Sequence, residues 1–165
     1  MLGSVRGLEG DPKGAEAAFD RAVALAPNDP DTLLVVAWSQ PLIVGRAEEA
    51  VQHGRHAMAL DPASPAVYAP GLAVAEYAAG EYEEAVATLR LAPLEGGETL
   101  MYWAMAQAQL GHAEEARAAV ERIRSEFPSF TVEGYIRDFP VIAPAALAVI
   151  REGAAKAGLL PAATQ

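Results

Sequence analysis

Small and apolar residues recur along this chain at helical spacing, in units of nearly constant length. Four similar strings, GDPKGA, GRAEEA, GEYEEA and GHAEEA, begin at Gly10, Gly45, Gly80 and Gly111, so they are separated by 35, 35 and 31 residues. Each string leads into an apolar pattern with helical periodicity, whereas the strict alternation typical of strands is absent. A recurring period of this length predicts a repeat architecture built from helices.

Each unit carries the signals for two antiparallel helices joined at its glycine. Gly45, Gly80 and Gly111 supply the left-handed residue that ends the first helix. Two glutamates then occupy the first turn of the second helix, where their negative charge meets the positive end of the helix dipole. Alanines such as Ala50 and Ala57 follow in the second helix, and their small side chains let the paired helices approach closely.

Prolines mark the ends of the second helices. Three units carry a proline 17 residues after the glycine, at Pro27, Pro62 and Pro128. The third unit instead has Pro93, which lies closer to its glycine. An N-cap and a first-turn proline for the next helix are predicted at Asp29-Pro30 and Ser64-Pro65.

This pattern resembles the tetratricopeptide repeat, a unit of about 34 residues with a glycine near the helix turn, two alanines in the second helix and a closing proline. The resemblance implies an all-α fold, a right-handed superhelical solenoid of antiparallel helix pairs. It covers about 3.5 repeats over residues 1–128, and the first repeat is truncated because Leu2-Gly3 matches a pair inside the repeat. Trp38 and Pro41 depart from the family pattern, and Pro41 and Pro70 are expected to kink their helices.

After Pro128 the periodicity stops, and residues 129–165 are predicted to form C-terminal capping helices and a tail. We expect a short helix over 130–138, a break at Phe139-Pro140 and an amphipathic helix over 144–157 that ends at Gly158. A solenoid needs such a distinct terminal unit to cover its exposed end. This region also resembles the end of the repeat region attached to bacterial adenylate and guanylate cyclases and to winged-helix regulators, which implies a regulatory arm of a larger bacterial protein.

Composition and charge narrow the function classes. The chain has 165 residues, of which 52% are apolar and 21% charged, which is enough apolar material for a folded core. Its net charge of -10 disfavours nucleic acid and anionic lipid as partners. No apolar run approaches the ~20 residues of a membrane helix, and no signal peptide is recognisable, so a cytoplasmic location is expected.

The residues offer no chemistry typical of catalysis. Cysteine is absent, and no Walker loop, GxSxG, GxGxxG or HExxH motif occurs. His53 and His56 lie three residues apart with Glu49 nearby, but they form only part of a metal site. The chain is therefore predicted to be no enzyme and to need neither a metal nor a cofactor.

The family resemblance implies that the first helix of each pair lines a concave groove, and that this groove binds a protein or peptide. The groove positions that it selects are mostly apolar and include one charged residue: Thr32, Val35, Ser39, Leu42, Val67, Val74, Tyr77, Glu98, Met101, Met105 and Gln109. Such a surface suits an apolar or amphipathic helix. The alternative is a structural module for homo-oligomerisation, whose groove is filled by the chain's own terminal helices.

The truncated first repeat predicts a second contact surface. Residues 1–9 are too few to cover the apolar side of the helix that carries Ala15, Phe19, Ala22 and Val23. Exposed apolar patches on soluble proteins usually mark contacts. Self-association into a homodimer through this end is the resulting hypothesis.

Overall fold

The computed structural model describes residues 10–139 and 143–160, and these residues form helices without any strand. The all-α prediction is thereby confirmed. In chain order the helices are α2 (Pro12–Leu25), α3 (Pro30–Ile43), α4 (Ala47–Leu60), α5 (Pro65–Ala79), α6 (Tyr82–Leu89), α7 (Gly97–Gln109), α8 (Ala113–Glu126), α9 (Val132–Asp138) and α10 (Pro144–Ala157). Over the described part of the chain, every helix is too short or too polar to cross a membrane.

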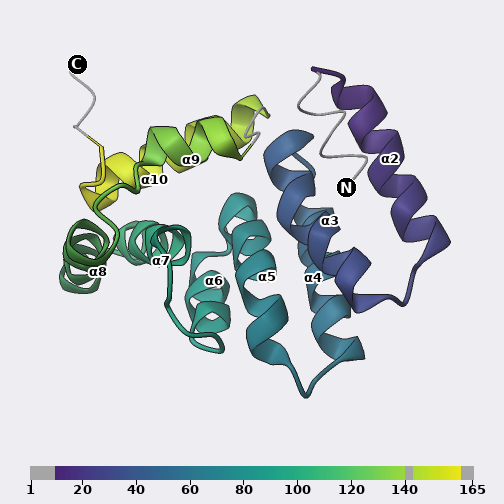
Figure 1. The fold of residues 1–165 in the computed structure, drawn as a ribbon, viewed down its shortest axis with the longest axis horizontal. Helices are drawn as coiled ribbons and strands as arrows, with labels where there is room; N and C mark the ends of the chain where they lie inside the picture. The colour runs from purple at the N-terminus through teal and green to yellow at the C-terminus, as the bar shows by residue number, and fades with distance from the viewer. Residues whose placement is uncertain (1–9, 140–142, 161–165) are drawn as a thin grey trace.

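The helices are stacked as successive antiparallel pairs, which confirms the predicted solenoid. α3 packs on α4, α5 on α6 and α7 on α8, and each pair also contacts the next. Figure 1 shows this succession from α2 at one end to α8 at the other. α2 is the second helix of the first pair. The first helix of that pair, predicted before Gly10, lies outside the described residues.

The turns within the pairs form where the sequence places them. Gly45, Gly80 and Gly111 have φ angles of +79°, +81° and +80°, a region that only glycine enters at no steric cost. The Asp29 carboxylate accepts a hydrogen bond from the Thr32 amide at 3.0 Å and so caps α3. Ser64 is the N-cap of α5 and Pro65 lies in its first turn, as predicted, although the Ser64 side chain makes no capping hydrogen bond.

Two departures from the family pattern shape the middle of the array. α6 has only 8 residues, because it ends at Leu89 before the segment that contains Pro93. Pro41 and Pro70 lie inside α3 and α5, and both helices continue through them.

The core is uneven along the array. The largest cluster of buried side chains joins α5, α6, α7, α8, α9 and α10. At the other end, Ala15 and Phe19 of α2 pack against Val36 and Ile43 of α3 in a small separate cluster. Most of the apolar burial, which stabilises the fold in proportion to area, therefore lies in the half that contains α9 and α10.

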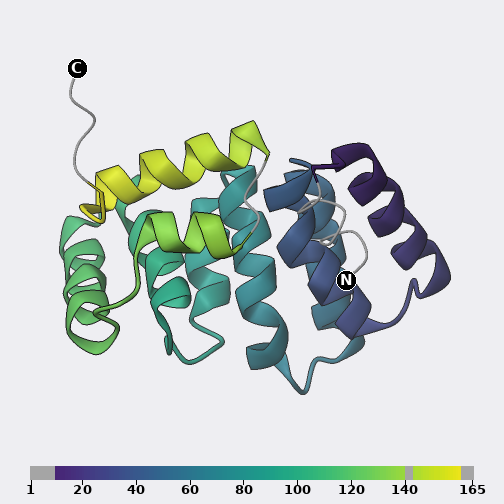
Figure 2. The ribbon, with the colours of Figure 1, turned by 45° about the horizontal axis from the view of Figure 1, so that its top comes forward.

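α9 and α10 lie across the first helices of the pairs, as Figure 2 shows. α10 packs mainly on α7 and also contacts α3, α5, α8 and α9. α9 begins at Val132, two residues later than predicted, and α10 has the predicted bounds, with Gly158 left-handed at φ +83°. Pro140 of the predicted break lies outside the described residues. α9 and α10 share the core of the array, and the domain division after residue 128 stays a prediction.

Candidate partner-binding groove

The predicted concave side of the array consists of one stripe of side chains on each of α3, α5 and α7. Residues three or four apart on a helix lie on the same face. Val35, Trp38 and Leu42 form such a stripe on α3. The corresponding positions are Val67, Pro70, Val74 and Tyr77 on α5, and Glu98, Met101, Met105 and Gln109 on α7.

α10 covers the end of this surface where the three helices finish. The Ala143 amide donates to the Leu42 carbonyl at 3.0 Å, and the Lys156 ammonium donates to the Gln109 side chain at 3.0 Å. Gly153 allows the closest approach, because a Cβ added there would lie 1.8 Å from the Tyr77 hydroxyl oxygen. The small residues of α10 are therefore what lets this helix lie against the groove.

α9 and the residue after it cover the middle of the surface. The Phe139 ring stacks on Trp38 with centroids 5.5 Å apart, and on its other neighbour, Tyr135, at 5.3 Å. The Tyr135 and Tyr102 hydroxyl groups are hydrogen-bonded at 2.9 Å inside the protein. Because these aromatic contacts join α3, α7 and α9, they hold α9 in the groove.

The predicted groove residues consequently divide into three groups. Leu42, Val74, Tyr77, Met101 and Met105 are buried, so in this structure they offer little surface to a partner. Thr32, Ser39, Glu98 and Gln109 are partly buried. Val35 and Val67 are 39% and 55% exposed. We call the uncovered surface formed by Thr32, Val35 and Val67 the open strip; whether any of these residues binds a partner stays a prediction.

Glu98 is the charged residue of the groove, and its surroundings are unusual. Its Oε1 accepts a hydrogen bond from the Trp38 indole nitrogen at 3.2 Å. Burial raises the pKa of Glu98 from 4.5 to about 7, although hydrogen bonds from Trp38 and Tyr135 act in the opposite direction. This carboxyl therefore changes its charge near neutral pH.

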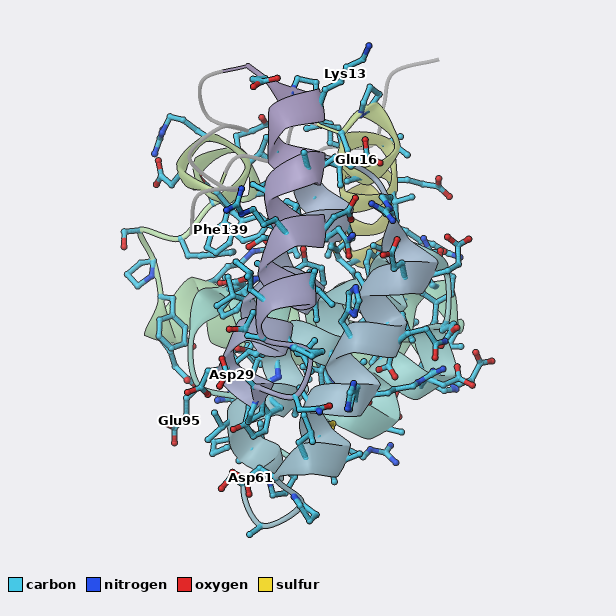
Figure 3. All side chains as sticks on the ribbon, turned by 90° about the vertical axis from the view of Figure 1, so that its right-hand side faces the viewer. Lys13, Glu16, Asp29, Asp61, Glu95 and Phe139 are labelled. Atoms are coloured by element: carbon cyan, nitrogen blue, oxygen red, sulfur yellow. The ribbon has the colours of Figure 1, made fainter. Side chains whose placement is uncertain are left out.

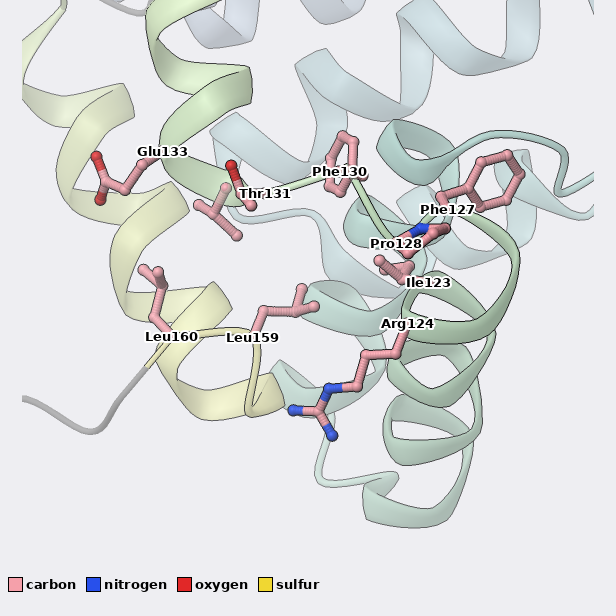
Figure 4. A pocket seen from close by; sticks show the side chains of 10 residues that line it. Ile123, Arg124, Phe127, Pro128, Phe130, Thr131, Glu133, Leu159 and Leu160 are labelled. Atoms are coloured by element: carbon pink, nitrogen blue, oxygen red, sulfur yellow. The ribbon is translucent and has the colours of Figure 1, made fainter.

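Two larger clefts flank the loop between α8 and α9. One, of about 360 Å³, is lined mainly by apolar side chains from α8, this loop and the residues after α10 (Figure 4). Arg124 borders it and donates to the Gly158 carbonyl at 3.1 Å. The other, of about 410 Å³, lies between the first turn of α7 and α9, and Glu98 is part of its wall.

Sequence reasoning missed Tyr135, Phe139 and Gly153 as groove residues. The sequence signal for these three residues was weak, because they lie after the last repeat. No repeat period there indicates which helix face points toward the groove. The single glycine inside α10 was a usable sign, since glycine costs about 1 kcal/mol relative to alanine in a helix and is retained where a backbone approaches closely.

The N-terminal candidates lie on α2, which faces the viewer in Figure 3 with Lys13 and Glu16 near its start. Ala15 and Phe19 are 0% and 2% exposed, so they are unavailable for contact as the structure stands. Ala22 and Val23 are partly buried. The large exposed apolar side chain on this helix is Leu25, at 74%.

The glutamate pairs and the histidines form no metal-binding cluster in the part of the chain that the structure describes. Glu48 and Glu49, like their counterparts on α6 and α8, lie in a first helical turn as expected. His53 contacts Glu49 at 3.5 Å on the same helix. Within the described ranges, no three metal-ligating side chains come together.

Comparison with protein families gives two matches to tetratricopeptide repeat models. One spans residues 42–110 and the other residues 98–129. Together they cover 42–129, which is more than half of the chain and includes α4 to α8. A comparison with curated protein sequences gives no match. The resemblance of the C-terminal tail to cyclase-linked repeats is untested and stays a prediction.

Proposed function

Because the chain belongs to the tetratricopeptide repeat family, whose repeats generally mediate protein–protein interaction, we propose that it is a non-catalytic scaffold that binds a helical segment of a partner protein. The segment is apolar or amphipathic and lies on the open strip of the concave surface. The finer expectations, a regulatory arm of a larger bacterial protein and a cytoplasmic location, belong to this proposal.

The observation that carries the proposal is that the chain's own α10 occupies part of the same surface. α10 is amphipathic: Ala146, Ile150 and Ala154 are buried, whereas Arg151 and Glu152 are exposed. The stripe on which it lies continues along α3 and α5 to Val35 and Val67. A surface that accepts one amphipathic helix at its covered end and presents valines at its uncovered end supports the binding of a second such helix.

The test compares two pairs of substitutions that introduce equal charge. A partner is first identified by affinity capture from the native lysate with the unaltered chain, and its Kd is measured. Val35→Glu with Val67→Glu is expected to weaken binding at least tenfold, because both valines would be buried under the partner. Leu60→Glu with Leu91→Glu alters two similarly exposed residues outside the stripes and should leave the Kd unchanged.

An equal loss for both pairs would point to a general charge effect. Unchanged binding by a folded Val35→Glu/Val67→Glu variant would place the contact elsewhere. Circular dichroism of each variant checks the fold.

The alternative function is a structural module for homo-oligomerisation. Two observations favour it: α9 and α10 fill much of the groove, and Leu25 is exposed at the N-terminal end. Light scattering at micromolar concentration separates the two proposals. A dimer that Leu25→Glu dissociates supports this alternative, and a monomer at every concentration contradicts it.

A further inference from the structure

The cleft between the first turn of α7 and α9 has a composition that suits a cation. Its wall contains the rings of Phe127, Phe130, Tyr135 and Phe139 and the Glu98 carboxyl group. The Phe139 ring is already stacked on Trp38 and Tyr135, so the rings serve here as apolar walls for an aliphatic stem. The Glu98 carboxylate supplies the charge opposite to that of a cation. The cleft volume of about 410 Å³ is within the range of small-ligand sites.

The other charged groups at this cleft leave a net negative charge when Glu98 is ionised. Arg137 also lines it, but its guanidinium is bound to the Asp138 carboxylate through two hydrogen bonds, of 2.7 and 3.1 Å. The remaining titratable groups facing Glu98 are the Tyr102 and Tyr135 hydroxyls, and burial raises the pKa of both. Glu98 is therefore the unneutralised anion of the cleft.

Glu98 also borders a smaller internal cavity with Trp38, Pro70 and Val74. Pro70 and Val74 belong to the stripe that carries Val67, so the carboxyl group lies where the open strip meets α9. A chain laid on the open strip would bring its side chains within reach of the cleft.

We propose that this cleft binds a primary ammonium group, namely a lysine side chain of the partner segment, with the Glu98 carboxylate as its anion and the aromatic rings as its walls. The inference rests on the proposed function for the source of the lysine. A primary ammonium needs only one lone pair of this carboxylate, whose Oε1 also accepts the Trp38 bond. The chain's net charge of -10 favours a basic partner.

The first test is an NMR titration of the full chain with Nα-acetyl-lysine amide at pH 8. The Trp38 indole N–H is the reporter, since it is bonded to Glu98, and Trp103 serves as the internal reference. We expect a saturable shift of the Trp38 signal. Nα-acetyl-norleucine amide, which has the same aliphatic stem without the charge, should bind at least tenfold more weakly. Equal binding of the two compounds would overturn the proposal.

Ionisation of Glu98 provides a second test on the unaltered chain. The ammonium keeps its charge throughout the range from pH 6 to 8, whereas a carboxyl with a pKa of about 7 becomes mostly ionised across it. The affinity for the lysine compound should therefore rise about tenfold from pH 6 to pH 8, as follows from the change in the ionised fraction of a group with that pKa. An affinity that does not change with pH would show that Glu98 is not the anion.

Substitution gives the third test and separates this inference from the proposed function. Glu98→Gln should lower affinity for the lysine compound at least tenfold, while Glu95→Gln, at an exposed loop position nearby, should not change it. A folded Glu98→Gln variant with unchanged affinity would overturn the inference. If that variant still binds the captured partner fully, the scaffold function stands without the lysine contact. If the lysine compound binds but no partner depends on the open strip, only the scaffold function fails.

Discussion

The two ends of the repeat array are finished in different ways. At the N-terminal end, α2 is held on α3 by a small cluster that includes Phe19 and Val36. At the C-terminal end, α9 and α10 leave the line of the array and turn back over its concave side, where Tyr135 and Ile150 join the largest core cluster. We call the end with α2 the weakly held end, because a small cluster attaches this helix to the stack. We call the end with α9 and α10 the locked end, because both helices are part of the largest core cluster.

This difference shows how a solenoid distributes stability. Repeats contact mainly their neighbours, so a helix near the end of the described array has few partners and opens at low free energy. α2 packs mainly on α3, and its Glu16 and Asp20 pair with Arg46 at the start of α4. Contacts from α10 to α3, α5, α7 and α8 are long-range for such a fold and tie several repeats together. The helices that stabilise one half also occupy part of its binding surface, while the other half keeps the open strip.

The largest effect expected is at the weakly held end. Phe19→Ala removes the principal side chain of the small cluster and should lower the opening free energy of α2 by up to about 3 kcal/mol. Hydrogen exchange measured by NMR should accelerate in α2 and stay unchanged in α7. Equal acceleration in both helices would show that the array unfolds as one unit and would remove the distinction between its ends.

At the locked end, the close approach of α10 gives the next largest effect. Gly153→Ala places a Cβ against the Tyr77 hydroxyl, so it should destabilise the protein by about 2 kcal/mol, although alanine favours helices over glycine by about 1 kcal/mol. Urea unfolding measures the change. Tyr77→Phe in the same chain should recover part of the loss, since it removes the atom nearest to the added carbon.

A control at an exposed position of α10 completes this test. Ala148→Ser should change the free energy of unfolding by less than about 0.5 kcal/mol. Stabilisation by Gly153→Ala would mean that α10 does not lie on Tyr77 in solution, and the end of the groove near Tyr77 would then be open.

The smallest effect expected concerns the pH dependence of the locked end. Because the folded state holds the Glu98 proton up to about pH 7, against 4.5 for the free group, ionisation between these values disfavours folding. The unaltered chain should lose about 1–2 kcal/mol of stability, relative to Glu98→Gln, as pH rises from 5 to 8; this range allows for partial solvent screening. Urea titrations at several pH values measure it. If the difference in unfolding free energy between the two proteins did not change with pH, the Glu98 carboxyl group would not be buried as the structure has it.

Much of the fold could be predicted from the sequence, because its signals are local. The 35-residue period, the glycines at 45, 80 and 111 and the aspartate at 29 determine where helices begin and end through backbone conformation and capping. α10 has the predicted bounds for the same reason: Pro144 and Gly158 are start and stop signals that act within one turn.

Those local signals did not predict which parts of the groove are covered. Helical spacing places the residues of each stripe on one face of their helix, and the family resemblance predicted that Val35, Val67 and Met105 share one surface. What covers that surface depends on where α9 and α10 dock, and docking is decided by side-chain packing between residues far apart in the chain. Tyr77 and Val149, whose hydroxyl and carbonyl groups are hydrogen-bonded at 3.4 Å, are separated by 72 residues.

By itself, then, the sequence determined the helices and their pairing, since periodicity and caps act over a few residues. Only the tertiary structure decided that Met101, Met105 and Tyr77 are buried, that Val35 and Val67 stay exposed and that Glu98 lies in a cleft with a raised pKa. The physical reason is that burial and desolvation depend on every element that packs against a residue, and here those elements come from the non-repeating end of the chain.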